Sequence, residues 1–177
     1  MTMIYWASLE QGDTCHYLFA NEEGLVMITL PQETFQDAVL WIKRHFTTCQ
    51  LIEHPRELEG YRRALIDYWD GDFGTASSIK YSLRGTSFQR TVWEELLKIP
   101  YGMTVNYQDI ADRIGRPKAV RAVANAIAAN PIPYLIPCHR VIGKNGKLTG
   151  YRGGLEVKKA LLERENVKNY SLTHAPT

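Results

Sequence analysis

The sequence predicts an α+β fold, in which a small N-terminal domain of antiparallel sheet plus helices precedes a mostly helical, winged helix-turn-helix domain. Short aromatic and β-branched runs separated by turn sequences fill the first thirty residues, and amphipathic helical periodicity dominates the rest. A stretch rich in glycine and serine interrupts this periodicity at residues 71–78. We therefore expect an N-terminal supporting domain at residues 1–80, a C-terminal domain at 81–168 and a flexible tail at 169–177.

The N-terminal half begins with three expected strands, at residues 3–8, 15–20 and 24–30. Polar turn sequences containing glycine separate them, which is typical of a β-meander. Two amphipathic helices follow, because apolar residues recur at helical spacing within residues 35–46 and again within 58–69.

The C-terminal half carries clear helix boundaries. Thr86 and Gln89 are spaced as a capping box, Asn106 can cap a second helix, and Gly115 ends that helix before a tight turn. These signals predict helices at residues 86–98, 107–114, 118–129 and 155–165. The middle two, joined by a short turn containing glycine, form a helix-turn-helix. Asn145-Gly146 predicts a hairpin, or wing, after it.

The helix at 118–129 has an unusual composition. Ala119, Ala122, Ala126 and Ala129 form a face with almost no side chain, and Arg121 is the only charge after Lys118. Such a face lets the backbone approach another surface closely. That surface is either a nucleic-acid groove or a neighbouring helix.

Length and composition exclude several classes of protein. With 177 residues, 45% hydrophobic and 23% charged, the chain is neither disordered nor fibrous. No apolar run approaches the roughly 20 residues that span a bilayer, and the N-terminus does not resemble a signal peptide. Three cysteines, an odd and small number, favour a reducing compartment. We expect a soluble, cytoplasmic protein.

The formal charge of +2 hides a division between the two halves of the chain. Residues 1–80 carry 6 Lys+Arg against 12 Asp+Glu, whereas residues 81–177 carry 15 against 7. The net charges are therefore −6 and +8. The basic half is either a nucleic-acid-binding surface or a solvated basic face.

The stretch from Ile136 to Val141 contains the strongest candidate for chemistry. Cys138 follows an apolar segment, and a cysteine in apolar surroundings needs a partner to accept its proton. His139 is adjacent, but neighbouring side chains of an extended segment point apart, so a proton relay through one water is the better route. The imidazole then needs a carboxylate to hold its tautomer, and Arg140 could favour the thiolate. A packed cysteine beside a surface histidine is the alternative.

Four motifs in order resemble the signature of the O6-alkylguanine-DNA alkyltransferases in their short, two-domain bacterial form. Over about residues 84–166 the likeness is close; in the N-terminal half it is limited to the order of strands and helices. The motifs are Pro100-Tyr101-Gly102, Asn106-Tyr107-Gln108, Pro117-Lys118-Ala119-Val120-Arg121-Ala122-Val123, and Asn130-Pro131-x-Pro133-x-x-Ile136-Pro137-Cys138-His139-Arg140-Val141 followed by Gly150-Tyr151-Arg152-Gly153-Gly154.

The resemblance implies a set of catalytic residues. Cys138 would attack the alkyl carbon on guanine O6, His139 would take the thiol proton through a water, and Glu165 would hold His139. Tyr107 would donate to the guanine as negative charge develops on it. Asn130 would keep the helix-turn-helix in register with the active-site segment.

The resemblance also implies how DNA is held. The target base must leave the duplex, and Arg121 would fill the vacated stack while the alanine face enters the narrow minor groove. The implied DNA contacts are Arg121, Gln108, Arg116, Ala119 and Lys144. The implied lining of the base pocket is Tyr151, Arg152, Val141 and Pro133.

The implied reaction is stoichiometric, because a thioether has no easily broken bond to the protein. It needs no cofactor, and the implied partner is double-stranded DNA containing O6-alkylguanine, with O4-alkylthymine as a second possible substrate and the protein a monomer. No metal is expected, because the candidate ligands do not match a zinc pattern. These are Cys15, His16, His45, Cys49 and His54. Arg152 stands where smaller residues also occur in the family, so the size of the pocket is open.

Two other functions share parts of this pattern. Alkyltransferase-like proteins flip the base without repairing it, but their signature replaces the reactive cysteine, which is intact here as Cys138. A winged-helix transcription regulator would explain the basic half and the helix-turn-helix. It would leave Tyr107 and the segment around Cys138 without a purpose.

Overall fold

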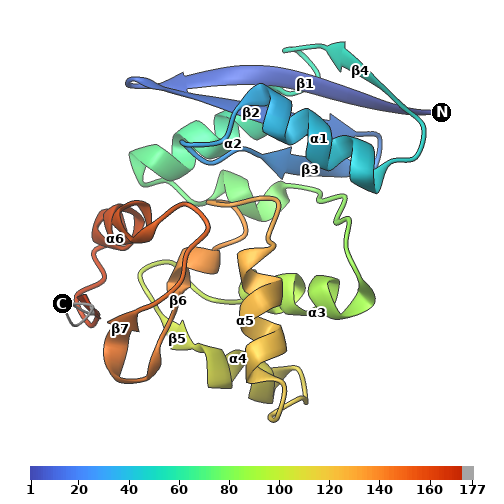
Figure 1. Ribbon diagram of the computed structural model, residues 1–177. Helices are drawn as coiled ribbons and strands as arrows, with labels where there is room; N and C mark the ends of the chain where they lie inside the picture. The colour runs from blue at the N-terminus through green and yellow to red at the C-terminus, as the bar shows by residue number, and fades with distance from the viewer. Residues whose placement is uncertain (173–177) are drawn as a thin grey trace. The chain divides into compact units, whose positions relative to one another are not determined.

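The computed structural model describes residues 1–172, and within it the chain forms two compact units (Figure 1). The first unit comprises residues 1–85 together with 131–135, and the second comprises 86–130 and the chain from 136 onward. The α+β class expected from the sequence is confirmed.

A four-stranded sheet in the order β3-β2-β1-β4 forms the centre of the first unit. Its strands are β1 (Thr2–Gln11), β2 (Thr14–Asn21), β3 (Gly24–Ile28) and β4 (Cys49–Glu53). The three expected strands pair antiparallel as a meander. The fourth, β4, runs parallel to β1 and was not expected. Its five residues are too short to carry a periodic signal between two helices.

The two helices of this unit, α1 (Phe35–His45) and α2 (Glu59–Asp70), were both expected. A capping box between Thr34 and Asp37 starts α1. The buried face of α1 packs on apolar side chains of the sheet, including Phe19 and Val26. On α2, Trp69 lies against the ring of His16 from β2, with 5.1 Å between ring centroids. The sheet thus buries apolar and aromatic side chains against both helices.

Residues 81–85 and 131–135 belong to the first unit, although the expected boundaries place them in the C-terminal domain. Residues 79–82, near the expected linker, lie along β3, because Leu25 donates to the Lys80 carbonyl and Ser82 donates to the Leu25 carbonyl. Residues 131–135, which the expected boundaries place in the C-terminal domain, also cluster here. Ile28 donates to the Pro131 carbonyl, and Tyr134 packs edge-on against His16. These contacts are tertiary, and no local pattern announces them.

The second unit contains the helices α3 (Ser87–Leu96), α4 (Tyr107–Arg113), α5 (Val120–Ala128) and α6 (Leu155–Arg164). The expected capping signals at Thr86 and Asn106 both form. Helices α3, α4 and α5 pack against one another, so the expected helix-turn-helix is present (Figure 1). Trp93 of α3 donates its indole N–H to the Ala126 carbonyl at 2.7 Å, which fixes α5 on α3.

The wing and the tail differ from expectation. Asn145 and Gly146 both have positive φ, 66° and 76°, as the expected tight turn requires. The strands beside it, however, find other partners in the part of the chain that is described. Strand β6 (Val141–Ile142) pairs parallel with β5 (Val105–Asn106), and β7 (Lys147–Leu148) pairs with β8 (Ser171–Leu172). The expected tail therefore includes a strand at 171–172, and residues 173–177 lie outside the described residues.

A small apolar cluster joins α6 to these strands. It contains Ile142, Leu148, Leu162 and Val167, all buried. Because Val167 follows α6 and Ile142 follows the Cys138 segment, this cluster brings the C-terminal end of α6 beside that segment.

Candidate functional site

Cys138 lies at the start of a short 3-10 helix, Cys138–Arg140. Pro137 before it has φ −80° and ψ 63°, and Cys138 donates its N–H to the Ile136 carbonyl at 2.8 Å, which defines an inverse γ-turn. The side chain of Asn130 donates to the same carbonyl at 2.9 Å. Cys138 is 6% exposed. The cysteine is therefore held in one position in a nearly dry environment.

Competing effects act on the Cys138 thiol. Burial raises its pKa, as expected for a thiolate without solvent. Contacts with the side chains of Asn130 and Tyr151 and the positive charge of Lys158 act in the opposite direction. The protein thus supplies thiolate-stabilising groups at the point where burial alone would make the sulfur inert.

His139 and Glu165 form a buried pair. His139 donates from Nε2 to a Glu165 carboxylate oxygen at 2.6 Å, and neither side chain is exposed. Burial lowers the pKa of His139, against the opposing effect of Glu165, so the ring is neutral near pH 7. Because Nε2 carries the proton that Glu165 accepts, a proton arriving from Cys138 must go to Nδ1. The carboxylate sets the tautomer that a general base needs.

Arg140 holds Glu165 in place. Its guanidinium donates to both carboxylate oxygens, from Nε at 2.8 Å and from a terminal nitrogen at 3.0 Å, and to the Ile99 carbonyl at 2.7 Å. The backbone of Gly102 adds a further donor to Glu165 at 3.1 Å. Burial alone would raise the pKa of Glu165, but the hydrogen bonds from His139 and Arg140, together with the charge of Arg140, lower it to about 2. Arg140 therefore positions and stabilises the Glu165 carboxylate, whereas the sequence suggested a direct effect on Cys138.

Tyr107 and Lys158 meet at one carbonyl. Tyr107, at the start of α4, donates its hydroxyl to the Thr149 carbonyl at 3.0 Å, and Lys158 Nζ donates to the same oxygen at 3.1 Å. Lys158 also donates to the Val141 carbonyl at 2.5 Å, and its Nζ lies 5.9 Å from the centre of the Tyr107 ring. Burial raises the pKa of Tyr107, so its hydroxyl keeps its proton near neutral pH.

Lys158 is the principal site residue that the sequence did not reveal. It is fully buried on α6, and burial lowers its pKa to about 8. Its charge and that of Cys138 act on each other. A lysine at an apolar position of a helical pattern could have signalled this role, because lysine is almost never fully buried without a partner.

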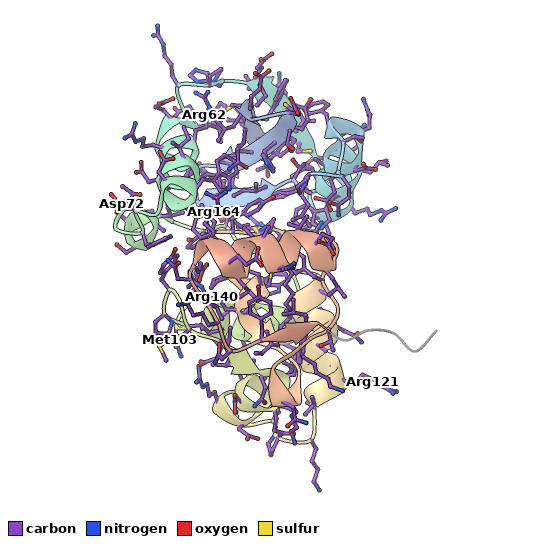
Figure 2. The ribbon with its side chains drawn as sticks, turned by 90° about the vertical axis from the view of Figure 1, so that its left-hand side faces the viewer. Arg62, Asp72, Met103, Arg121, Arg140 and Arg164 are labelled. Atoms are coloured by element: carbon purple, nitrogen blue, oxygen red, sulfur yellow. The ribbon has the colours of Figure 1, made fainter. Side chains whose placement is uncertain are left out.

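Four of the five residues expected to bind DNA lie on α4, on α5 or in the connection between them, and Lys144 lies between β6 and β7. Arg121 is exposed and extends away from α5 (Figure 2). Ala119 caps α5 and is half-buried, and Arg116 and Lys144 are exposed in turns. Gln108 instead uses its amide N–H groups within the fold, on Asp112 and on the Pro117 carbonyl, both at 2.9 Å.

The alanine face of α5 is only partly as expected. Ala122 and Ala129 are exposed, together with Asn125 between them. Ala126 is buried, at 2% exposure, because it lies under Trp93 of α3. The exposed face is therefore narrower than the sequence indicated and includes an amide side chain.

The structure brings together most residues expected to line the base pocket. Tyr151 interacts with Cys138, and Val141 is buried directly after the 3-10 helix. Arg152 donates to the Asn130 carbonyl at 2.9 Å. Pro133 is also buried, but it belongs to the segment 131–135 of the first unit.

Across residues 1–172 we find no group of three or more histidine, cysteine, aspartate or glutamate side chains placed to hold a metal ion. The histidines considered as ligands make other contacts: His16 bonds the Thr29 carbonyl and His45 bonds the Trp41 carbonyl. No helix in the same residues is both long enough and apolar enough to cross a membrane.

Known proteins are similar to this chain in sequence and in fold. Residues 87–167 match the family model of the 6-O-methylguanine DNA methyltransferase DNA-binding domain. A methylated-DNA–protein-cysteine methyltransferase of Mycobacterium tuberculosis is 51% identical, over 92% of this chain and 93% of that protein. An inducible one of Bacillus subtilis is 41% identical, over 92% and 90%. The chain belongs to the methylated-DNA–protein-cysteine methyltransferase family.

A solved structure supports the assignment of the fold. The crystal structure of Mycobacterium tuberculosis OGT in complex with DNA matches with a TM-score of 0.73 at 37% identity, covering 91% of this chain and 92% of that one. In the present methyltransferase, the residues matched by the family model include Cys138, His139 and Glu165. All three belong to the second unit.

Proposed function

We propose that Cys138 accepts the alkyl group when this methyltransferase repairs O6-alkylguanine in DNA by direct reversal. The observation that carries the proposal is the buried pair of His139 and Glu165 directly after Cys138 in the second unit. A buried cysteine is followed directly by a histidine whose tautomer is fixed by an ionised carboxylate, Glu165. This is the arrangement of a nucleophile, a base and a group that orients the base.

The proton leaves first. Cys138 gives its thiol proton through one water to Nδ1 of His139, whose Nε2–H stays on Glu165. The resulting imidazolium is stabilised by that carboxylate, and the thiolate is stabilised by the charge of Lys158. The Glu165 carboxylate and the Lys158 ammonium are thus charged before the proton moves, in a site that excludes water.

Displacement follows in one step. A new bond forms between Cys138 Sγ and the alkyl carbon while the bond from that carbon to guanine O6 breaks. The electron pair of the broken bond stays on the guanine. Tyr107, whose hydroxyl retains its proton in this site, donates a hydrogen bond to the guanine ring as negative charge develops there. The products are a thioether on Cys138 and a guanine anion, which takes up one proton to become unmodified guanine; that proton balances the one that Cys138 gave to His139.

Each molecule reacts once under this proposal, because a thioether does not return the group. The balance needs no cofactor, since the alkyl group, the proton and the electron pair all come from the base and from the residues named. O4-alkylthymine presents the same alkyl–oxygen bond and is a candidate second substrate.

DNA would be held by the second unit. Arg121 extends from α5 into solvent, and the exposed Ala122 and Ala129 leave the helix surface low enough for a minor groove (Figure 2). We assign Arg121 to fill the stack when the base flips out, and Arg116, Lys144, Ala119 and Gln108 to the surrounding contacts. Gln108 would act mainly by fixing the turn, because its amide donors are used within the fold.

We further propose that residues 1–80 act as a supporting domain, that residues 81–168 hold the chemistry, and that the protein works as a monomer. A free nucleophilic cysteine requires a reducing compartment, which supports a cytoplasmic location. A winged-helix transcription regulator is a less well supported hypothesis than alkyl transfer, because it leaves the buried network around Glu165 without a function.

Mass spectrometry of the reacted protein tests the proposal. The full chain is incubated with a duplex carrying one O6-methylguanine, and the peptides are examined for an added methyl group. We expect one methyl on the Cys138 peptide, none with Cys138→Ser, and an unchanged result with Cys15→Ser, which removes a half-buried cysteine outside the site. Transfer that survives Cys138→Ser would contradict the proposal.

A further inference from the structure

The segment from Thr149 to Gly154, between β7 and α6, covers one side of the Cys138 site. It begins where Thr149 accepts hydrogen bonds from Tyr107 and Lys158. Two glycines with positive φ, Gly150 at 44° and Gly154 at 89°, lie near its ends. Side-chain-bearing residues rarely adopt these angles, so the backbone can turn at both points where most residues would resist.

Tyr151 is the part of this segment that faces the sulfur. It interacts with the Cys138 thiol, and Cys138 is only 6% exposed. An alkyl group bound to O6 must therefore enter a space whose size depends on where this segment rests. The position of the segment is a determinant of which adducts fit.

Arg152 helps to fix that position through a directed hydrogen bond. Its guanidinium donates to the backbone carbonyl of Asn130 at 2.9 Å, just after α5. The side chain of Asn130 in turn bonds Ile136 and acts on the Cys138 thiol. The link from Arg152 thus ends on the residue whose side chain holds the segment before Cys138.

We propose that Arg152 is a latch that holds the segment 149–154 closed over Cys138 and thereby favours methyl over bulky O6 substituents. A methyl group reacts with the latch closed. A benzyl group needs the segment to move outward about Gly150 and Gly154, which breaks the bond to Asn130. Arg152 is then a specificity-determining residue that acts through position and does not contact the reacting atoms. The inference rests on the proposed function of the same site.

Two variants of Arg152 separate this role from others. Arg152→Met keeps much of the aliphatic stem and removes the donors, while Arg152→Lys keeps the charge but loses the planar guanidinium. Lys168→Met is the matched control, because it removes one positive charge from an exposed position of the same unit. Thermal unfolding of each variant establishes that it is folded.

The measurements are single-turnover rates with duplexes carrying O6-methylguanine or O6-benzylguanine, and with O6-benzylguanine as the free base. We expect Arg152→Met to raise the ratio of the benzyl rate to the methyl rate about tenfold. That change is about 1.4 kcal/mol and is close to the worth of one hydrogen bond from a charged donor. Arg152→Lys should fall between Met and wild type, and Lys168→Met should match wild type.

A reagent that needs no DNA keeps this test apart from the proposed function. Iodoacetamide should alkylate Cys138 faster in Arg152→Met than in wild type, with the Cys15 peptide as internal reference. A ratio within twofold of wild type together with unchanged iodoacetamide reactivity would overturn the latch. So would a change confined to duplex substrates, because Arg152 would then act on DNA. If wild type transfers no alkyl group at all, the proposed function fails, while the iodoacetamide rates still report on the latch.

Discussion

Replacing Lys158 with methionine should slow alkyl transfer at least about tenfold while leaving the fold intact. The lysine is fully buried, donates to the carbonyls of Val141 and Thr149, and places a positive charge where it favours the Cys138 thiolate. Methionine has a similar length and no charge. The variant therefore removes the charge with little change in packing volume.

The expected change in stability is small because two effects oppose each other. Burial lowers the pKa of Lys158 from 10.5 to about 8, so keeping it charged in the folded state costs about 3 kcal/mol, and methionine relieves that cost. The substitution also leaves the buried Val141 carbonyl without its donor, at about 1–3 kcal/mol. We expect the free energy of unfolding at pH 7 to stay within about 2 kcal/mol of wild type.

The expected change in rate is large. Removing the positive charge of Lys158 raises the pKa of Cys138. Each unit of increase in that pKa lowers the thiolate fraction at pH 7 about tenfold. Single-turnover transfer from an O6-methylguanine duplex at pH 7 should slow by at least about tenfold. Lys159→Met is the control, because Lys159 is half-buried on the same helix and its Nζ lies 3.8 Å from a Glu163 oxygen. This control should keep the wild-type rate.

Urea unfolding at several pH values provides a second readout. Because the folded state loses the Lys158 proton near pH 8 and the unfolded state near 10.5, wild type should gain stability relative to Lys158→Met between these values. The gain should reach about 2–3 kcal/mol by pH 10. A flat difference across this range, or a transfer rate within twofold of wild type, would refute the reasoning.

Three further predictions concern the same unit. Glu165→Gln should cost about 3 kcal/mol of stability above pH 4.5, because the folded-state pKa of Glu165 in wild type is about 2. In urea unfolding, the difference between wild type and variant should shrink as the pH falls from 4.5 toward 2. A difference that stays constant over this range would argue against the buried ion pair. Tyr107→Phe should slow transfer at least tenfold but lower the melting temperature by only a few degrees, since it removes one hydrogen bond to Thr149; equal and small effects on both would exclude a role in charge stabilisation. Arg121→Ala should slow repair in duplex DNA far more than reaction with free O6-benzylguanine, and equal slowing of the two rates would contradict base flipping by this residue.

The parts of the fold that follow from local rules were predictable from the sequence. Capping boxes at Thr86 and Asn106 start two helices where expected, because the side chain and the backbone donors it satisfies lie within three residues. Strand β4 was missed, since its five residues become a strand only through pairing with β1. The same holds for β8, whose two residues pair with β7.

The partners of the charged residues in the site were harder to predict from the sequence. His139 and Glu165 were paired correctly through the family resemblance, and the carboxylate that a histidine base requires is present. The sequence suggested that Arg140 acts on the Cys138 thiolate, whereas its guanidinium binds Glu165. A sequence does not show which of two nearby groups an arginine reaches. Lys158 was not predicted, because its one local signal, an apolar position in the pattern of α6, does not show that it reaches the carbonyls of Val141 and Thr149.

The Asn130 motif has a physical explanation that joins fold and chemistry. The chain leaves the second unit after Asn130 and returns at Ile136, since residues 131–135 cluster with the first unit. Asn130 donates its side-chain amide to the Ile136 carbonyl at 2.9 Å, across the two ends of that excursion. Without this bond, the five intervening residues would let Cys138 shift relative to α5, which is expected to hold the DNA. An asparagine fits this position because its amide donates to Ile136 and also acts on the Cys138 thiol, so one side chain couples the binding helix to the nucleophile.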